Sequence, residues 1–471
     1  MLNDGQENSA RPAEFAPEAP GTATATPVRA KFFAGADWVS FWLATLLALA
    51  VYLWTLAPDV TLSDSGMLST GAMYAGVPIP PGYPVWTLYA WLFTKLLPFS
   101  NTAWRVAVSS AVAGALVCGL IALMVSCGGK LLLEGLRGFN RLPLGKDKRL
   151  RVVCGVVAGL GFGFDRWFWH ETIRAATWSL SILTLCLTLV LLMRWFREPE
   201  RRGFVYAASF VYGLALCNSQ LLLAAAFGLQ VIAMCSSAEL RRDVCFANSI
   251  IFVGGLIANW TGVLPMLDRG TPGTNLLRLS FLLVGAGSIG LCAWLTLQTR
   301  RLLTEGRLVF GAGIMFLLGL MPHLYLPLAS MTSPPTNWGY PRTVEGFWHC
   351  VTRGQYERLN PTCGFHRFGE QLAMFGDCAT KDLGLFYAVI ALIPFCLLHR
   401  MQNRERRWMF GLLAVFMCLT VLVVIVLNPP LDRQAREMVA PWFTPAHLVL
   451  AIWSGYGLTW LGAMLAREKT T

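Results

Sequence analysis

The sequence predicts an all-α polytopic membrane protein that crosses the bilayer about 12 times, with an interfacial helix in its first external loop. Three features of the 471-residue chain predict this class: 55% of its residues are hydrophobic, only 14% are charged, and its mean hydropathy is +0.54. A soluble domain carries about 25% charged residues, so this chain has roughly half the usual number of groups that keep a surface in water. The composition therefore excludes a soluble enzyme, a disordered scaffold and a coiled coil.

Both ends of the chain are predicted to be cytoplasmic tails. Residues 1–37 are rich in Ala, Pro, Thr and Glu and poor in bulky apolar side chains, which is typical of a disordered segment. The apolar run 38–57 follows Arg29 and Lys31 and has no small-residue cleavage site, which favours an uncleaved signal anchor. Residues 38–466 then form one transmembrane domain, and residues 467–471 form the second tail.

Further spans are expected wherever about 20 mainly apolar residues follow one another, the length that crosses the hydrocarbon core. Beyond the anchor they lie at about 104–127, 152–165, 177–195, 203–217, 220–236, 244–264, 279–298, 308–328, 385–398, 408–427 and 443–465. We interpret the apolar stretch 85–98 as an interfacial or re-entrant helix, because counting it as a span would move the basic loop 129–151 outside. Its Trp86, Tyr89 and Trp91 suit the aromatic belt at a membrane surface. An ordinary thirteenth span is the alternative.

The positions of the basic residues predict the orientation. Lys and Arg concentrate in the short cytoplasmic loops of membrane proteins. With the N-terminus inside, the cytoplasmic segments hold 25 of the 38 basic residues, and the loops 58–103 and 329–384 lie outside. We therefore expect both termini in the cytoplasm and, in a bacterium, a place in the plasma (inner) membrane. Because the +12 net charge is scattered over many loops, it does not indicate nucleic-acid binding.

Familiar sequence motifs for zinc, nucleotide phosphate, dinucleotides or a serine nucleophile are missing, so no metal ligands are assigned. Gly159, Gly161 and Gly163 alternate inside an apolar span, which indicates helix packing rather than phosphate binding.

Two external segments carry the most unusual sequence. Segment 57–84 has no Lys or Arg and contains Asp64, whereas segment 324–356 is rich in Pro and aromatic residues. Pro and Gly do not continue a helix cheaply, so both segments are expected to leave the spans as loops. They predict a site at the outer surface with Asp64 as its acid; the alternative makes Asp64 part of a plain turn. The candidate cations for a lipid phosphate are Arg105, Arg342 and Arg353.

These segments also resemble a known family. The DSG after the first span, the PPGYP about 14 residues later and the block LYLPL…PPTNWGYPRTVEGFWHCVTRGQY are similar to a large family of bacterial and eukaryotic polytopic proteins. That family was long labelled a domain of unknown function and is now grouped with the GT-C glycosyltransferases; its animal member is a protein O-mannosyltransferase. The resemblance runs over about 38–462 and is most specific in 324–356.

The resemblance implies a GT-C-like bundle and a reaction. Such an enzyme transfers a sugar, mannose among the candidates, from a polyprenyl-phosphate donor in the bilayer to a protein or lipid acceptor on the extracytoplasmic face. Asp64 matches the family's Asp and would act as base toward the acceptor hydroxyl or orient it. An Arg or a divalent metal would stabilise the leaving phosphate, and the cofactor is otherwise undefined. Tyr83 and Trp338 join the three arginines as candidate substrate-binding residues.

The chain departs from the family pattern where that pattern carries titratable groups. The family reads Asp-Ser-Gly-Glu and has a His before the Pro-Pro-Gly-Tyr-Pro run; it also has a Glu and a His in later external turns. The corresponding residues here are Met67, Ile79, Ala176 and Gln220.

Three outcomes are therefore open. In the first, Asp64 works alone. In the second, His170 and Glu171 form a replacement acid/base pair, although both also suit a solvated interfacial loop. In the third, the chain is a catalytically inactive GT-C-like protein that binds a lipid-linked glycan or scaffolds a membrane partner. A transporter ranks last, because the spans hold few of the ionisable groups that transport requires.

Overall fold

The structure, a computed structural model, describes residues 32–136, 143–262, 272–354 and 360–468. Residues from Phe33 onward form one compact unit. The predicted disordered tail therefore lies mostly outside the described residues, as do the last residues of the second tail.

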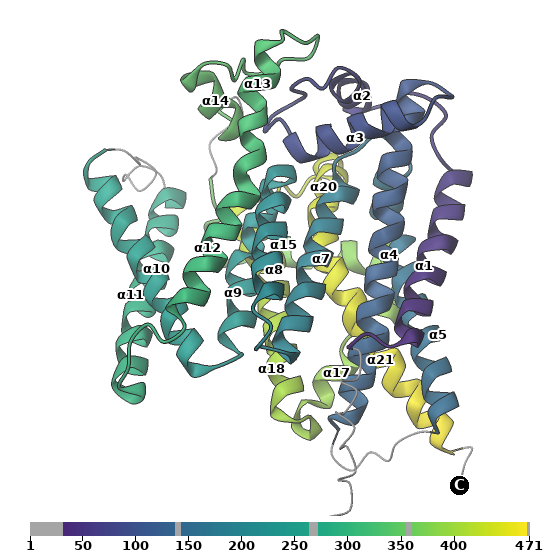
Figure 1. Ribbon diagram of the computed structural model, residues 1–471, viewed down its shortest axis with the longest axis vertical. Coiled ribbons are helices and arrows are strands. Elements are labelled where there is room, and N and C mark those ends of the chain that lie inside the picture. Colours follow the sequence, from purple (N-terminus) through teal and green to yellow (C-terminus); the bar gives the residue numbers. More distant parts are fainter. Residues whose placement is uncertain (1–31, 137–142, 263–271, 355–359, 469–471) are drawn as a thin grey trace, which may run out of the picture. The chain divides into compact units, whose positions relative to one another are not determined.

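The described residues form helices and no strands (Figure 1). The α-helices are α1 (Gly35–Trp54), α2 (Ser65–Met73), α3 (Pro84–Leu96), α4 (Thr102–Glu134), α5 (Leu144–Gly163), α6 (Arg166–Thr172), α7 (Trp178–Arg197), α8 (Gly203–Asn218), α9 (Ala225–Met234), α10 (Ala238–Trp260), α11 (Pro272–Thr299), α12 (Gly306–Leu320), α13 (Tyr325–Met331), α14 (Val344–Val351), α15 (Phe365–Asp382), α16 (Leu385–Ile390), α17 (Ile393–Cys396), α18 (Asn403–Met417), α19 (Val423–Leu427), α20 (Arg433–Val439) and α21 (Thr444–Glu468).

Enough of these helices can cross a bilayer to confirm a polytopic membrane protein. In the described chain, 8 are long and apolar enough, and 10 if each of two bent pairs is one span. The shorter apolar helices Gly203–Asn218 and Gln220–Met234 lie where two further spans were expected. The 13-residue α3 is too short to cross about 30 Å of hydrocarbon, in keeping with the expected interfacial helix.

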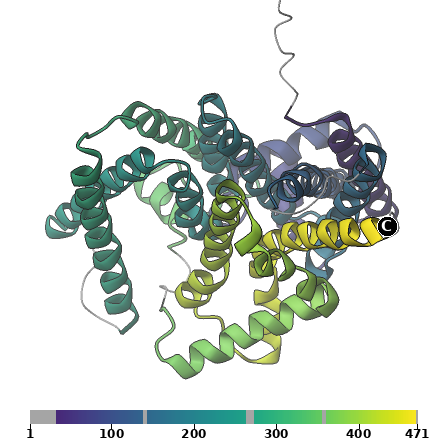
Figure 2. The ribbon, with the colours of Figure 1, turned by 90° about the horizontal axis from the view of Figure 1, so that it is seen from below.

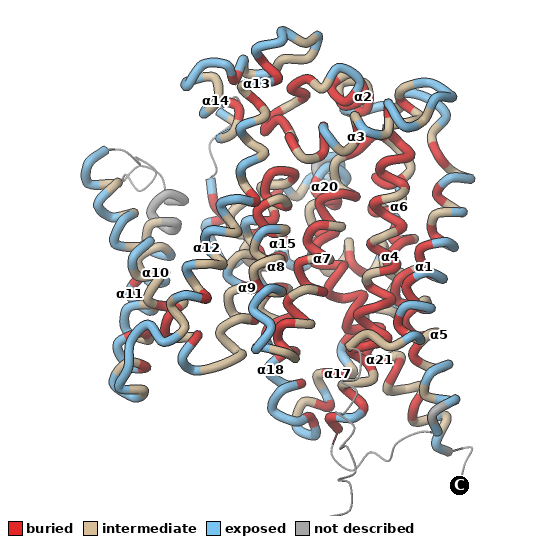
Figure 3. Tube along the Cα trace, viewed as in Figure 1, coloured by how far each residue is buried: buried red, intermediate tan, exposed pale blue. Residues whose placement is uncertain are grey.

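The most buried helices are α4, α7 and α21. The apolar windows of α4 and α7 are 83% and 78% buried, against 17% for α10 and α11, and Figure 3 shows the same contrast. Viewed from below, the teal hairpin of α10 and α11 lies on the rim of the structure (Figure 2). The packing of α5 on α4 depends on glycine, because a Cβ at Gly159 would lie 2.3 Å from the Cys118 carbonyl oxygen. The packing role predicted for this glycine is therefore confirmed.

The two segments with unusual sequence, 57–84 and 324–356, are docked together at one end of the bundle, where α2, α3, α13 and α14 gather (Figure 1). Val77 N donates to the Thr336 carbonyl at 2.9 Å, and Trp338 N donates to the Val77 carbonyl at 3.2 Å. Val77 also packs in a small buried cluster with Leu326 and Cys350. Burial raises the pKa of the Cys350 thiol to about 11, so this cysteine stays protonated at neutral pH and serves as an apolar side chain.

Two expected spans differ in shape from the prediction. The helix at the predicted span 152–165 is followed by α6, and the two helices are bent by 74°. The predicted span 385–398 is broken into short pieces and makes an angle of 110° with α15, which occupies part of the predicted external loop 329–384. Gly384, with a φ of +88°, allows the sharp turn, and Pro394 cannot donate a helical hydrogen bond.

Candidate functional site

A cavity of about 470 Å³ lies at the end of the bundle that carries α2. Its walls come from the start of α2, the PPGYP run, the stretch from α6 to the start of α7, and the stretch from α20 to the turn before α21. The titratable side chains that line it are Asp64, Tyr83, Glu171, Arg174 and Glu437, and its tryptophans are Trp167, Trp178 and Trp442. The cavity is thus both charged and aromatic, a combination that suits a polar ligand with apolar faces.

Asp64 lines this cavity and lies immediately before α2. The backbone forms the turn expected in the alternative interpretation, since Leu68 N donates to the Asp64 carbonyl at 2.9 Å. The carboxylate, however, does not cap the helix, and the residue is exposed. The side chain is therefore not committed to holding the turn and can interact with a ligand in the cavity.

Tyr83 reaches the cavity because the chain turns sharply at Gly82. This glycine has a φ of +93°, and a Cβ on it would lie 2.6 Å from the Leu326 side chain. Only glycine accepts both conditions without strain. The turn places Tyr83 directly before α3, whose first residue is Pro84.

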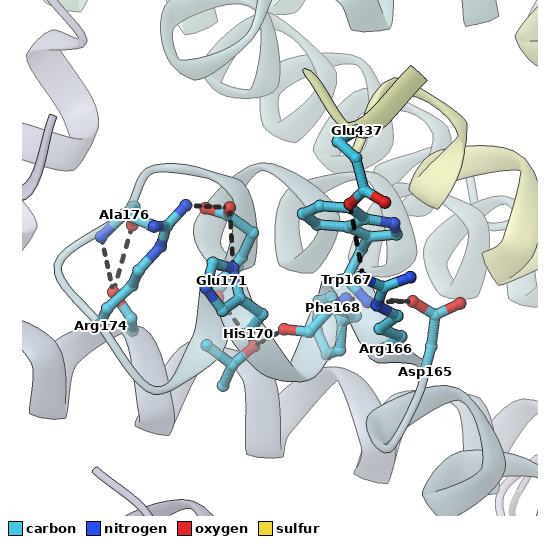
Figure 4. A network of polar contacts seen from close by, with 12 residues as sticks. Asp165, Arg166, Trp167, Phe168, His170, Glu171, Arg174, Ala176 and Glu437 are labelled. Carbon is cyan, nitrogen blue, oxygen red and sulfur yellow. Dashed lines mark hydrogen bonds and ion pairs between the residues drawn. The ribbon is translucent and has the colours of Figure 1, made fainter. Parts of the chain in front are cut away.

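Glu171 and Arg174 form the charged wall of the cavity (Figure 4). Arg174 donates to the Glu171 carboxylate, and the two side chains are only 15% and 7% exposed. His170 is different, because its side chain is 51% exposed and its ring lies against the edge of Trp167. Its Nδ1 is 3.8 Å from the Glu171 carboxylate, beyond hydrogen-bond distance. The structure thus places Glu171 in the cavity wall and His170 at the surface beside it.

The segment after α6 is fixed by contacts to α3 and α4. Trp86 Nε1 donates to the Ala176 carbonyl at 2.9 Å, and Ser110 Oγ donates to the same oxygen at 3.1 Å. The Ala176 side chain lines the cavity, as does that of Ile79. Two of the four departures from the family pattern therefore line the same cavity as Asp64.

The other two departures lie away from the cavity. Met67 is within α2 and does not line the cavity. Gln220 donates through Nε2 to the Val351 carbonyl, which ties the short 3-10 helix before α9 to the end of α14.

The three arginines and the tryptophan predicted to bind substrate do not line this cavity. Arg105 donates to the backbone carbonyls of Phe99 and Ser100 at 2.9 and 2.8 Å, so it closes the turn between α3 and α4. Arg342 lies over the ring of its neighbour Tyr340, in the loop that leads to α14. Trp338 belongs to the same loop, and Arg353 lies two residues after the end of α14.

Sequence reasoning missed Arg174 and the wall formed by α20 and the following turn. Arg174 follows Glu171 by three residues, just beyond the end of α6, and this spacing of opposite charges was a detectable signal for the pair. Glu437 and Trp442 gave no such signal, because only the folded chain brings them to the same cavity as Asp64. Glu437 also accepts from Arg166 at 3.4 Å at the surface.

Within the described chain, one group of three side chains is close enough to hold a metal ion. It consists of Asp165, Asp382 and His447 and lies next to the cavity wall, because Asp165 is the N-cap of α6. Its members are far apart in the sequence and form no spaced motif, which explains why no metal ligands were predicted.

Comparisons with known proteins agree with the family resemblance. Residues 64–241 match the family model described as the protein O-mannosyl-transferase TMEM260 N-terminal domain. Protein O-mannosyl-transferase TMEM260 of Mus musculus is 33% identical over 173 residues, which are 36% of this chain and 22% of the mouse protein. The protein of that name from Dictyostelium discoideum is 36% identical over 78 residues, 16% of this chain and 9% of the relative.

The chain thus covers about a fifth or less of the length of these two relatives. Among solved structures, ArnT from Cupriavidus metallidurans bound to undecaprenyl phosphate is similar with a TM-score of 0.29 and 13% identity, over 93% of this chain and 79% of ArnT. The family match spans Asp64, Tyr83, Glu171 and Arg174, so three of the four walls of the cavity lie in the related region.

Proposed function

We propose that this chain, which over residues 64–241 is related to the protein O-mannosyl-transferases, is a membrane glycosyltransferase of the GT-C type. In this proposal it transfers a sugar, mannose among the candidates, from a polyprenyl-phosphate donor to a hydroxyl group of a protein or lipid acceptor. The observation that carries the proposal is the cavity in which an uncommitted carboxylate, Asp64, shares the walls with the Glu171–Arg174 pair.

Each part of the cavity has a role in this reaction. The Asp64 carboxylate accepts a hydrogen bond or proton from the acceptor hydroxyl, which requires an approach of about 3 Å. Arg174 is the cation of the cavity and stabilises the negative charge that develops on the leaving phosphate. The aromatic rings of Tyr83, Trp167 and Trp442 offer flat apolar faces to the sugar. A donor with a lipid tail suits a cavity at the end of helices that can cross a bilayer.

The face of the membrane is part of the proposal. The distribution of Lys and Arg favours cytoplasmic termini, and the loop that contains Asp64 then lies on the extracytoplasmic side.

Transfer of a labelled sugar by the purified protein tests the function. Polyprenyl-phosphate mannose and glucose are supplied as donors, with peptide and lipid acceptors. Asp64→Asn is expected to lower the rate by about 100-fold or more. The matched control is Asp59→Asn, an exposed carboxylate of the same loop that does not line the cavity and should leave the rate unchanged. Equal activity of Asp64→Asn and wild type, or no transfer by wild type from either donor, would contradict the proposal.

A catalytically inactive relative that binds a lipid-linked glycan or scaffolds a membrane partner is the second candidate. It is favoured by Ile79 and Ala176, which line the cavity at positions where the family pattern carries titratable groups. A photo-crosslinking polyprenyl phosphate distinguishes the two candidates. Labelling of the cavity without turnover supports the inactive relative, whereas labelling with turnover supports the transferase.

A further inference from the structure

We propose that Asp165, Asp382 and His447 bind a divalent metal ion. Zn²⁺ is the first candidate and Mn²⁺ is the second. One ligand atom from each residue, a carboxylate oxygen or an imidazole nitrogen, lies within 4.8 Å of the others. The three residues come from three helix ends: Asp165 precedes α6, Asp382 ends α15, and His447 is in the first turn of α21.

Some nitrogen and oxygen atoms of the cluster are not used in hydrogen bonds and are available to bind a metal. Asp165 Oδ1 accepts from the backbone N–H groups of Trp167 and Phe168 at 3.0 Å each, so this oxygen is occupied by the helix cap (Figure 4). Asp165 Oδ2 lies 2.9 Å from His447 Nδ1. His447 Nε2 and Asp382 Oδ2 are both shielded from solvent and have no hydrogen-bond partner among the described residues. Buried polar atoms are normally satisfied, so two such atoms in one cluster point to a ligand.

The carboxylate charges of Asp165 and Asp382 also favour a bound cation. Asp165 and His447 are completely buried, and Asp382 is half-buried beside them. In the described part of the chain, no Lys or Arg forms an ion pair with either carboxylate. The neighbouring Arg166 instead pairs with Glu437 at the surface, where both side chains are more than half exposed. One fully buried and one half-buried carboxylate beside a single imidazole therefore form an acidic cluster that favours a bound cation.

The ligand types select the class of metal. Zn²⁺ binds imidazole nitrogen and carboxylate oxygen, and Mn²⁺ also accepts carboxylates. Ca²⁺ takes six to eight oxygen ligands and Mg²⁺ keeps several waters, so neither suits a site that includes an imidazole. Three protein ligands also leave a coordination position for water, as in open zinc sites.

The ion would hold two walls of the cavity in place. Asp165 caps α6, the helix that carries Trp167 and Glu171, and His447 lies just after Pro441 and Trp442. A metal at this position would thus join the start of α6 to the start of α21. This role is one of positioning, and it depends on the fold rather than on the proposed transfer reaction.

The metal content of the full-length chain tests this proposal. The protein is purified in detergent through a tag without histidine, and its bound metals are measured by mass spectrometry. Wild type should contain about one zinc or manganese per chain, and Asp382→Asn and His447→Gln should contain less than a tenth of that. The matched control is Asp377→Asn in the same helix, because that carboxylate pairs with Lys381 at 2.7 Å and is half-exposed. It should keep the metal.

Thermal unfolding gives a second measurement, which does not depend on whether the two ligand variants fold. A strong chelator should lower the Tm of wild type and of Asp377→Asn, and added Zn²⁺ should restore it. The proposal is overturned if wild type holds less than a tenth of an equivalent of metal and its Tm responds neither to chelator nor to Zn²⁺ or Mn²⁺. In that case the three side chains are held together by hydrogen bonds and bind no metal. Because neither measurement uses a sugar donor, failure of the transferase proposal leaves this result unchanged.

Discussion

At the scale of single residues, the cavity separates side chains that the sequence treats alike. Arg105, Arg342 and Arg174 are all arginines of predicted external regions, yet Arg174 lines the cavity and the other two do not. Arg105 donates to backbone carbonyls, and the direction of those carbonyls cannot be inferred from a list of residues. Asp64 was predicted because the DSG run is recognisable, whereas Glu437 could be found only once α20 had been placed next to α2.

Neutralising Arg174 tests whether the cavity, rather than the loop before α14, supplies the phosphate-binding cation. Arg174→Gln should lower sugar transfer by about 100-fold, because it removes a donor aimed at the developing charge and leaves Glu171 unpaired. Arg342→Gln should be close to wild type. Initial rates at saturating donor provide the comparison. The opposite ranking of the two variants would move the phosphate site to the loop before α14.

At the scale of the elements, the sequence predicted where helices occur better than how they end. Apolar runs of about 20 residues identify α4 and α7 because burial and membrane insertion both select such runs. The bend after α5 escaped prediction because Asp165 looks like the polar end of a span, although it caps a second helix. Helix α15 was missed because an amphipathic helix inside a polar loop lacks a continuous apolar run.

The contact between α4 and α5 gives a prediction about stability. Gly159→Ala would place a methyl group 2.3 Å from the Cys118 carbonyl oxygen, so one helix must move. The expected loss of unfolding free energy is about 1–3 kcal/mol. Gly145→Ala, in the first turn of the same helix, has open space around the added Cβ and should be neutral or slightly stabilising. Thermal unfolding in detergent compares the two variants; equal Tm values would mean that α4 and α5 do not pack this closely.

At the scale of the whole molecule, the sequence predicted the class of protein and the structure supplied the site. Composition alone indicates a helical membrane protein, since 14% of the residues are charged against about 25% in a typical soluble domain. The cavity could be predicted only in part. Its walls come from loops and helix ends spread from residue 63 to residue 442, and their meeting depends on how the long helices pack.

The orientation of the whole chain in the membrane can be tested by labelling cysteines. In intact cells, a membrane-impermeant maleimide should label Ser63→Cys, at the cavity, and should leave Gln402→Cys unlabelled until the membrane is permeabilised. Wild type supplies the background, because Cys363 and Cys396 are exposed in the native chain. The reverse labelling pattern would place the cavity in the cytoplasm and remove the basis for an extracytoplasmic reaction.

The docking of 336–338 on Val77 has an evolutionary consequence. It relies on main-chain N–H and carbonyl groups, which every residue except proline supplies in full. Mutations can therefore replace the side chains of this segment while its attachment persists. A proline at position 338 is the exception, because it would remove the N–H group that donates to the Val77 carbonyl.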